Sequence, residues 1–94
     1  MFYLMKTLKI FISGAVQGVF FRQFIKDKAD EIGVKGYVRN LEDGKVEVVI
    51  EGKDKEVNEM LKICRKGAPH SQVKELEIEE IPHQEFKDFK VLHI

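Results

Sequence analysis

The sequence predicts an α+β sandwich in which two helices cover one face of an antiparallel sheet of four to five strands. Two observations carry this prediction. Apolar residues recur at every second position in some segments and at every third or fourth position in two others. These segments follow the order strand, helix, strand, strand, helix, strand, with a short fifth strand at the end. Both helices then belong on one face, because each crossover returns the chain to the same side of the sheet.

The first part of the chain predicts one strand and one helix. In KTLKIFIS, residues 6–13, apolar residues occupy every second position, as in a strand with one core face. That core face consists of Leu8, Ile10 and Ile12. From Phe21 the spacing changes to three and four, which is typical of a helix. The apolar stripe of this helix consists of Phe21, Phe24, Ile25, Ala29 and Ile32. Gly33 is expected to end the helix in a left-handed cap.

The middle of the chain predicts a hairpin and a second helix. Residues 34–40 and 45–52 have strand patterns, and the Asp-Gly pair between them favours a tight turn. Asp54 is expected to be the N-cap of the helix that follows, and Gly67 to close it. The apolar stripe of this helix consists of Val57, Met60, Leu61 and Cys64.

The end of the chain completes the sheet. Residues 71–81 predict a fourth strand with Leu76 and Ile78 facing the core, and residues 88–94 predict a short terminal strand. This order of elements is that of the split β-α-β, or ferredoxin-like, fold. The 94 residues, 1–94, are expected to form a single domain.

The composition restricts the classes of function. The 16 basic and 16 acidic residues give a net charge of zero, which argues against a general polyanion binder. Cys64 is the single cysteine, so no intrachain disulfide forms, and with no signal-peptide pattern the chain is predicted to be cytoplasmic. No apolar run approaches the roughly 18 residues of a membrane span, so no membrane partner is expected. Nothing in the sequence demands more than a monomer.

The segment GAVQGVFFRQF, residues 14–24, joins the first strand to the first helix. Its glycines permit unusual backbone angles and close approach to a ligand. Successive N–H groups in such a turn form an anion-binding concavity at the positive end of the helix. Arg22 adds a two-pronged cation in a chain whose other arginines are only Arg39 and Arg65. The segment therefore predicts a phosphoryl-binding turn, and the alternative is an ordinary connection with a solvated arginine.

Two stretches resemble the signatures of the acylphosphatase family. GAVQGVFFR, residues 14–22, is similar to the family motif Gly-x-Val-Gln-Gly-Val followed by two residues and Arg. The stretch GYVRNLEDGKVEVVIEG, residues 36–52, resembles the second signature in spacing throughout. The two motifs stand in the right order and, with the matching order of elements, cover nearly the whole chain.

The resemblance implies a role for each site residue. It implies that Arg22 and the main-chain amides of the turn bind the phosphoryl oxygens, and that the side chain of Asn40 positions the attacking water. The amides are those of Ala15, Val16, Gln17, Gly18, Val19 and Phe20. The family often has a basic residue where this chain has Ala15, so weaker attraction of anionic substrates is expected here.

The absence of certain residues from the two motifs indicates the substrate. Neither motif has a His, Cys or carboxylate placed as nucleophile or proton donor, and no carboxylates stand at metal-binding spacing. The leaving group must then depart unaided, which a carboxylate with a pKa of about 4 does and an alkoxide does not. The predicted reaction is hydrolysis of an acyl phosphate to a carboxylate and inorganic phosphate, without metal or cofactor. A phosphoryl oxygen is the expected acceptor of the water's proton.

Two other classes of protein share this order of elements. RNA-binding modules read bases with aromatic side chains on their central strands, but residues 45–51 contain none, so no nucleic-acid partner is expected. A phosphate-binding domain inside a larger acyl- or carbamoyl-transfer enzyme is the second alternative. The chain has no zinc-finger cysteines for such an assembly, and a free-standing hydrolase is preferred.

The other reactive side chains have structural interpretations. Cys64 lies on an apolar helix stripe and is predicted to be a core residue. Arg39 is predicted to be an exposed partner for glutamates, and Phe20 and Phe21 to pack beneath the phosphoryl-binding turn. The histidines stand at no metal-ligand spacing and are expected on the surface: His70, His83 and His93.

Overall fold

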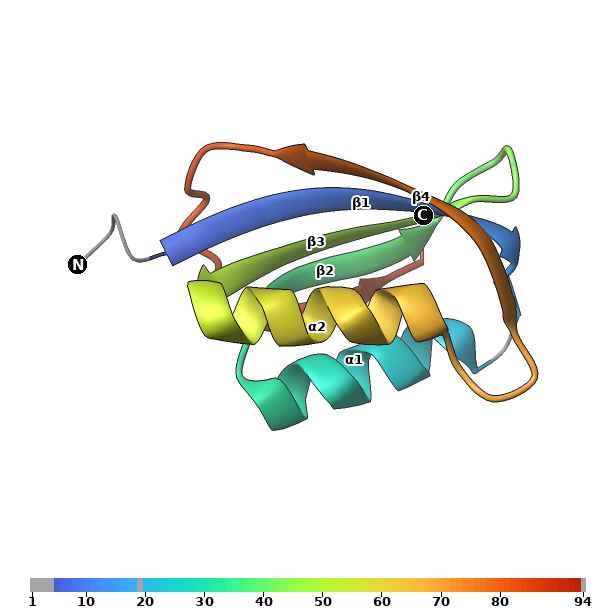
Figure 1. Cartoon of the computed structure of the whole chain (residues 1–94), viewed down its shortest axis with the longest axis horizontal. Helices are drawn as coiled ribbons and strands as arrows, with labels where there is room; N and C mark the ends of the chain where they lie inside the picture. The colour runs from blue at the N-terminus through green and yellow to red at the C-terminus, as the bar shows by residue number, and fades with distance from the viewer. Residues whose placement is uncertain (1–4, 19, 94) are drawn as a thin grey trace.

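A computed structural model describes residues 5–18 and 20–93 of the chain. The elements are β1 (Met5–Ala15), α1 (Phe21–Ile32), β2 (Lys35–Asn40), β3 (Val46–Lys53), α2 (Asp54–Lys66), β4 (Gln72–Glu80) and β5 (Phe89–Leu92). Both helices lie side by side on one face of the sheet (Figure 1). The predicted ferredoxin-like α+β class is confirmed.

The sheet has five strands in the order β4-β1-β3-β2-β5. The pairs β1–β3, β1–β4 and β2–β3 are antiparallel, as predicted. β5 pairs with β2 in parallel, with Leu92 opposite Arg39, so the sheet is mixed and the prediction of a wholly antiparallel sheet is wrong at this edge. The reason is the connection 81–88, which reverses the chain and carries it from β4 to the opposite edge of the sheet.

The core lies between the helices and the sheet. Its buried side chains come from both helices and from β1, β2, β3 and β5, and those at predicted positions are Leu8, Ile10, Ile12, Phe21, Ile25, Ala29, Val57, Met60 and Cys64. Three other predicted stripe residues are only partly buried and pack against this core: Phe24, Ile32 and Leu61. Cys64 is fully buried in this core, as predicted, and its burial raises the pKa of the thiol to about 12. Gly33 ends α1 in a left-handed conformation with φ of 99°, also as predicted.

The start of α2 differs from the prediction. The helix begins at Asp54, and the N-cap is Lys53. The Lys53 amide donates to Glu56 Oε1 at 3.1 Å, so a carboxylate within the first turn caps the helix. Asp54 is the first residue of the helix, and its carboxylate pairs with Lys6 Nζ at 2.7 Å.

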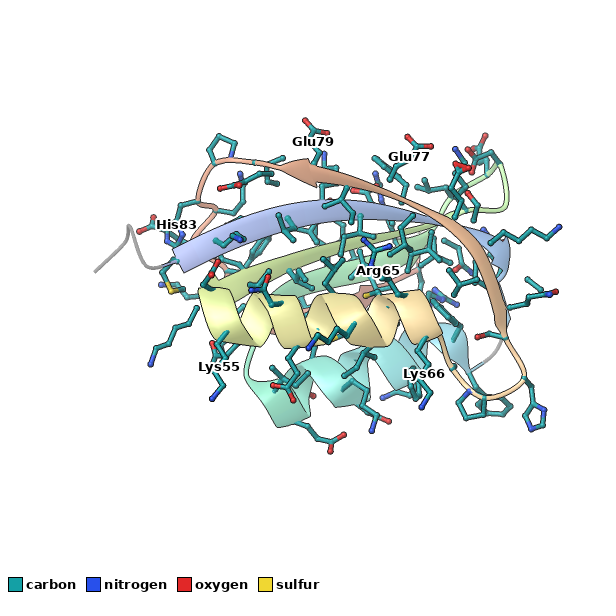
Figure 2. The ribbon with its side chains drawn as sticks, in the orientation of Figure 1. Lys55, Arg65, Lys66, Glu77, Glu79 and His83 are labelled. Carbon is teal, nitrogen blue, oxygen red and sulfur yellow. The ribbon has the colours of Figure 1, made fainter. Side chains whose placement is uncertain are left out.

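β4 forms one edge of the sheet and is more exposed than predicted. Leu76 packs partly against the core, but Ile78 is 40% exposed. Ile78 does stand opposite Ile10, on the predicted face, yet the helices leave this part of the edge strand uncovered. Glu77 and Glu79 project from the same strand (Figure 2), and such charges oppose pairing with another sheet edge.

Two glutamates of β3, Glu47 and Glu51, are buried. Glu47 is 3% exposed and accepts hydrogen bonds from Tyr37 Oη at 2.6 Å and from Arg39 Nε at 2.9 Å and Nη2 at 2.7 Å. Burial, with the adjacent Glu47 carboxylate, raises the pKa of Tyr37 to about 12. Arg39 thus has the glutamate partner predicted for it, and that partner is buried.

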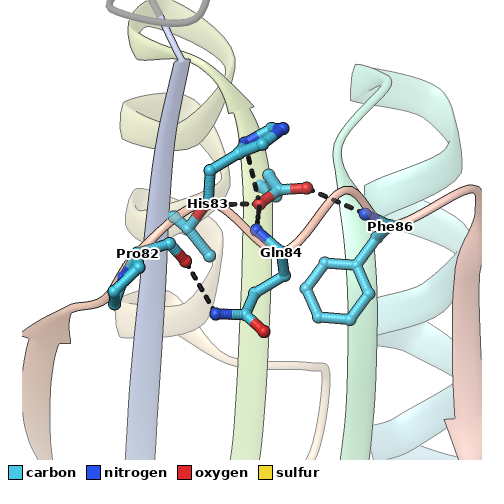
Figure 3. A network of polar contacts seen from close by, with 6 residues as sticks. Pro82, His83, Gln84 and Phe86 are labelled. Atoms are coloured by element: carbon cyan, nitrogen blue, oxygen red, sulfur yellow. Dashed lines mark hydrogen bonds and ion pairs between the residues drawn. The ribbon is translucent and has the colours of Figure 1, made fainter.

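The second buried glutamate, Glu51, holds the connection between β4 and β5. Its carboxylate accepts hydrogen bonds from Thr7 Oγ1 at 2.6 Å and from the amides of Gln84 at 2.6 Å and Phe86 at 3.0 Å. His83 Nδ1 lies 3.2 Å from the same carboxylate, and Figure 3 shows this convergence. Glu51 therefore directs the chain toward the edge where β5 pairs with β2.

Candidate active site

The predicted phosphoryl-binding turn begins at a bulge in β1. The pairing of β1 with β4 shifts between Ser13 and Gly14, and Gly14 has φ of 130°. A Cβ at this position would overlap the carbonyl oxygen of Gln72 and lie 2.9 Å from the Lys74 amide nitrogen. Only glycine fits here, and the bulge directs the chain out of the sheet and into the turn.

Gly18, the second glycine of the turn, differs from Gly14 in its backbone conformation. Gly18 does not have a positive φ, and a Cβ there would meet no heavy atom within 4 Å. The open space beside Gly18 leaves the backbone of the turn accessible to a ligand.

The amides of the turn have few partners inside the protein. Among the described residues, those of Gln17, Gly18 and Phe20 donate to no other group of the chain. Val19, also predicted as a binding residue, lies outside the described residues. Val16 is buried, and Ala15 is exposed at the end of β1. The amides of Gln17, Gly18 and Phe20 are therefore available as donors to a ligand.

The side chain of Gln17 connects the turn to the β2–β3 hairpin. Its Nε2 donates to the carbonyl oxygens of Leu41 at 2.8 Å and Lys45 at 2.9 Å. Leu41 directly follows Asn40, so this contact brings the turn next to the predicted water-positioning residue. The sequence interpretation used only the amide of Gln17 and missed this role of its side chain.

Arg22 lies in the first turn of α1 and is held by the end of β5. Its Nη1 donates to the carbonyl oxygen of Leu92 at 2.9 Å and lies 3.1 Å from Nδ1 of His93. Its Nε is buried and has no hydrogen-bond partner. His93 is on the surface, as predicted, but no motif or spacing in the sequence indicates its contact with Arg22.

Asn40 ends β2 beside the same stretch of β5. The residue before it, Arg39, stands opposite Leu92, whose carbonyl oxygen holds Arg22. The structure therefore brings Arg22, Asn40 and the turn to one end of the sheet. The carbonyl oxygen Oδ1 of Asn40 is buried and has no hydrogen-bond partner.

Two buried side-chain polar atoms are left without a partner in residues 5–18 and 20–93, and they are Arg22 Nε and Asn40 Oδ1. Buried polar atoms are nearly always paired, so an unpaired one calls for an explanation. An unpaired N–H needs an acceptor such as an anionic oxygen, and an unpaired carbonyl oxygen needs a donor such as the O–H of water. These needs match a phosphoryl group and an attacking water.

Phe20 was predicted to pack beneath the turn, but it does not. Its side chain is 78% exposed, whereas Phe21 is 4% exposed and packs in the core. Phe20 is the N-cap of α1, so it precedes the helix and lies outside the stripe that turns Phe21 inward.

Other kinds of site lack support in the described residues. No group of three or more His, Cys, Asp or Glu side chains is placed to bind a metal ion in residues 5–18 and 20–93. No helix in the same residues is both long and apolar enough to cross a membrane.

Comparison with known proteins identifies the family. The acylphosphatase family model matches residues 8–91. The chain belongs to the acylphosphatase family. The family, the fold class and the enzyme class predicted from the sequence are therefore confirmed. An acylphosphatase from Pyrobaculum aerophilum is 48% identical over 90 residues, which are 94% of this chain and 95% of that protein.

Solved structures agree with this membership of the acylphosphatase family. The structure of an acylphosphatase from Coxiella burnetii has a TM-score of 0.90 and 33% identity, covering 96% of this chain and 95% of that one. HypF from T. kodakarensis has a TM-score of 0.83 and 33% identity, covering 95% of this chain and 12% of that one. An acylphosphatase-like fold thus also occurs as a small part of a larger protein.

Proposed function

We propose that this acylphosphatase-family chain cleaves acyl phosphates by one in-line attack of water, with Arg22 and the turn amides holding the phosphoryl group and Asn40 holding the water. Family membership carries the activity, hydrolysis of an acyl phosphate to a carboxylate and inorganic phosphate. One observation carries the mechanism: the unpaired buried atoms belong to Arg22 and Asn40, the two side chains that the motifs indicate.

The phosphoryl group is bound by donors that are already in place. Arg22 uses Nη1 on the Leu92 carbonyl, which keeps the guanidinium fixed and leaves Nε for a phosphoryl oxygen. The amides between Ala15 and Phe20 supply further donors at the start of α1. In the transition state the negative charge is spread over the equatorial phosphoryl oxygens, and hydrogen bonds from such donors stabilise it. Donors that are fixed in advance need no reorganisation.

The water is oriented by Asn40. Its Oδ1 accepts one O–H of the water, and the water oxygen attacks phosphorus. The bond between phosphorus and the acyl oxygen breaks, and its electron pair leaves with the carboxylate. The water's proton moves to a phosphoryl oxygen, which gives inorganic phosphate. A carboxylate needs no proton to depart, so the step requires no general acid from the protein.

The same proposal extends to the setting of the reaction. We propose a cytoplasmic monomer in which residues 1–94 form a single acylphosphatase-like domain with no nucleic-acid or membrane partner. The net charge of zero and the absence of aromatic side chains from β3 support the lack of a nucleic-acid partner.

Phosphate release from benzoyl phosphate tests the roles of both side chains. Arg22→Ala should lower kcat/KM by about 10²- to 10³-fold with effects on both kcat and KM, because it removes a donor to the transition state. Asn40→Ala should lower mainly kcat. Arg65→Ala and Asn58→Ala replace the same residue types at exposed positions of α2 and serve as matched controls that keep wild-type rates.

Folded Arg22→Ala with the wild-type rate would show that the proposed role of Arg22 is wrong. A nucleic-acid shift assay on the same preparation separates the hydrolase from an RNA-binding module. Binding of RNA together with no phosphate release from any acyl phosphate would favour the RNA-binding alternative.

A further inference from the structure

A small cavity lies between the phosphoryl-binding turn and the connection from α2 to β4. Its volume is about 170 Å³, and it is lined by residues 15–18, Phe20 and Phe21 on one side and residues 68–71 on the other. None of these residues is Lys, Arg, Asp or Glu. An apolar cavity of about 150 Å³ is large enough for a benzene ring, so this one has room for an acyl group.

Phe20 lies at this cavity with most of its ring exposed. It is 78% exposed, and among the described residues Ile78 is the other large hydrophobic side chain with high exposure. Ile78 stands on the β4 edge and lines none of this cavity. An exposed aromatic ring beside a cavity offers a ligand considerable apolar area.

The opposite wall of the cavity is held by local contacts. Ser71 donates to the carbonyl oxygen of Ala68 through Oγ at 2.7 Å and through its amide at 3.1 Å. His70, between them in the chain, adopts a positive φ of 67°, which is uncommon for a residue other than glycine. The wall therefore has a defined shape before any ligand binds.

The geometry of in-line attack indicates on which side of the phosphoryl group the leaving group lies. In-line displacement places the attacking and leaving oxygens on opposite sides of phosphorus. The cavity shares the turn with the proposed phosphoryl site, but neither Asn40 nor Arg22 lines it. With the water at Asn40, the acyl group of the substrate points away from Asn40, and this cavity is a place on the turn that Asn40 does not line.

We propose that this cavity is the acyl-group subsite, that Phe20 is its main apolar contact, and that it favours acyl phosphates with uncharged, apolar or aromatic acyl groups. The proposal rests on the proposed function, because it needs the phosphoryl group in the turn. Ala15 contributes to it as a small uncharged residue at the cavity, where a long basic side chain would attract anionic acyl groups.

The test compares kcat/KM for benzoyl, acetyl and succinyl phosphate in wild type, Phe20→Ala, Phe20→Lys and Ile78→Ala. Wild type should prefer benzoyl over acetyl phosphate at least tenfold, and Phe20→Ala should reduce that ratio about tenfold. Any effect of the substitution on the turn amides acts on both substrates and cancels in the ratio. Phe20→Lys should raise the succinyl-to-benzoyl ratio, and Ile78→Ala should leave all ratios unchanged.

The outcomes separate this subsite from the proposed function. If wild type hydrolyses none of the three acyl phosphates, the proposed function fails. If wild type hydrolyses them but Phe20→Ala keeps the wild-type benzoyl-to-acetyl ratio within twofold, the subsite is overturned and the proposed function stands.

Discussion

At the scale of single residues, the contacts of Arg22 suit a guanidinium better than an ammonium. Its Nη1 donates a hydrogen bond to the carbonyl oxygen of Leu92, while Nε remains unpaired. A planar group with several donors in fixed directions can bind the Leu92 carbonyl with one nitrogen and a phosphoryl oxygen with another at the same time. An ammonium is a point charge on a flexible stem and does not hold the same geometry.

Arg22→Lys tests this interpretation because it keeps the positive charge. We expect kcat/KM for benzoyl phosphate to fall about 10²-fold, close to the effect of losing one transition-state donor. Arg65→Lys, at an exposed position of α2, is the matched control and should keep the wild-type value. A folded Arg22→Lys variant with more than half the wild-type kcat/KM would mean that charge alone suffices.

Gly14 is the second residue whose identity the structure explains. Gly14→Ala should lower the free energy of unfolding by at least about 2 kcal/mol, because φ is 130° and the new Cβ would overlap the Gln72 carbonyl. Urea unfolding measures this. Gly18→Ala is the control and should cost less than about 1 kcal/mol, since its Cβ meets open space. Equal losses for the two variants would contradict the assignment of the bulge.

At the scale of elements, four segments contact one another around the proposed site: the turn, the β2–β3 hairpin, α1 and β5. The turn is tied to the β2–β3 hairpin through Gln17, and α1 is tied to β5 through Arg22. β5 in turn pairs with β2, which carries Asn40 at its end. The position of each proposed functional group therefore depends on contacts between elements and not on its own element alone.

Gln17→Ala should separate positioning from stability. The side chain is exposed, so losing its two hydrogen bonds should cost at most about 1 kcal/mol of unfolding free energy. We expect kcat for benzoyl phosphate to fall about tenfold, because the turn amides lose their fixed position. Gln17→Glu should be worse still, since its carboxylate would face two carbonyl oxygens. An unchanged kcat in Gln17→Ala would show that the turn holds its shape without this contact.

At the scale of the whole molecule, the path of the chain after β4 decides where the site is completed. The connection 81–88 passes the Glu51 carboxylate and delivers β5 to the far edge of the sheet, where Leu92 contacts Arg22. Glu51 is 2% exposed, so its charge depends on the donors around it. This makes the stability of the whole fold sensitive to acid.

Burial alone would raise the pKa of Glu51, but the amides of Gln84 and Phe86, the Thr7 hydroxyl and nearby His83 together hold it below its usual value. A carboxyl whose pKa is lowered on folding stabilises the protein above the unfolded pKa of about 4.3, and this stability is lost as pH falls through the folded pKa. Glu51→Gln should therefore be less stable at pH 7, and its deficit relative to wild type should shrink below about pH 4.

Urea midpoints between pH 3 and 7 measure this difference. Glu59→Gln, at an exposed position of α2, is the control and should follow the wild-type curve. A deficit for Glu51→Gln that stays constant across the pH range would show that Glu51 acts by shape and not by charge.

Much of the molecule was predictable from local patterns. The alternation in β1 and the stripes of α1 and α2 identify the core faces, because a side chain's direction follows from its position in a strand or helix. Arg22 and Asn40 could be proposed as site residues from the sequence because each lies in a short contiguous motif. Asp54 was wrongly expected to cap α2, since its pairing with Lys6 depends on how β1 and α2 meet.

The amino-acid sequence by itself determined the elements, their order, the class of fold and the two side chains proposed for catalysis, because each is encoded in residues close together in the chain. Only the tertiary structure decided the parallel direction of β5, the exposure of Phe20 and the contact that fixes Arg22. That contact joins residues 70 positions apart. Local periodicity records which face of a strand is apolar, but it does not record which edge of the sheet a strand joins.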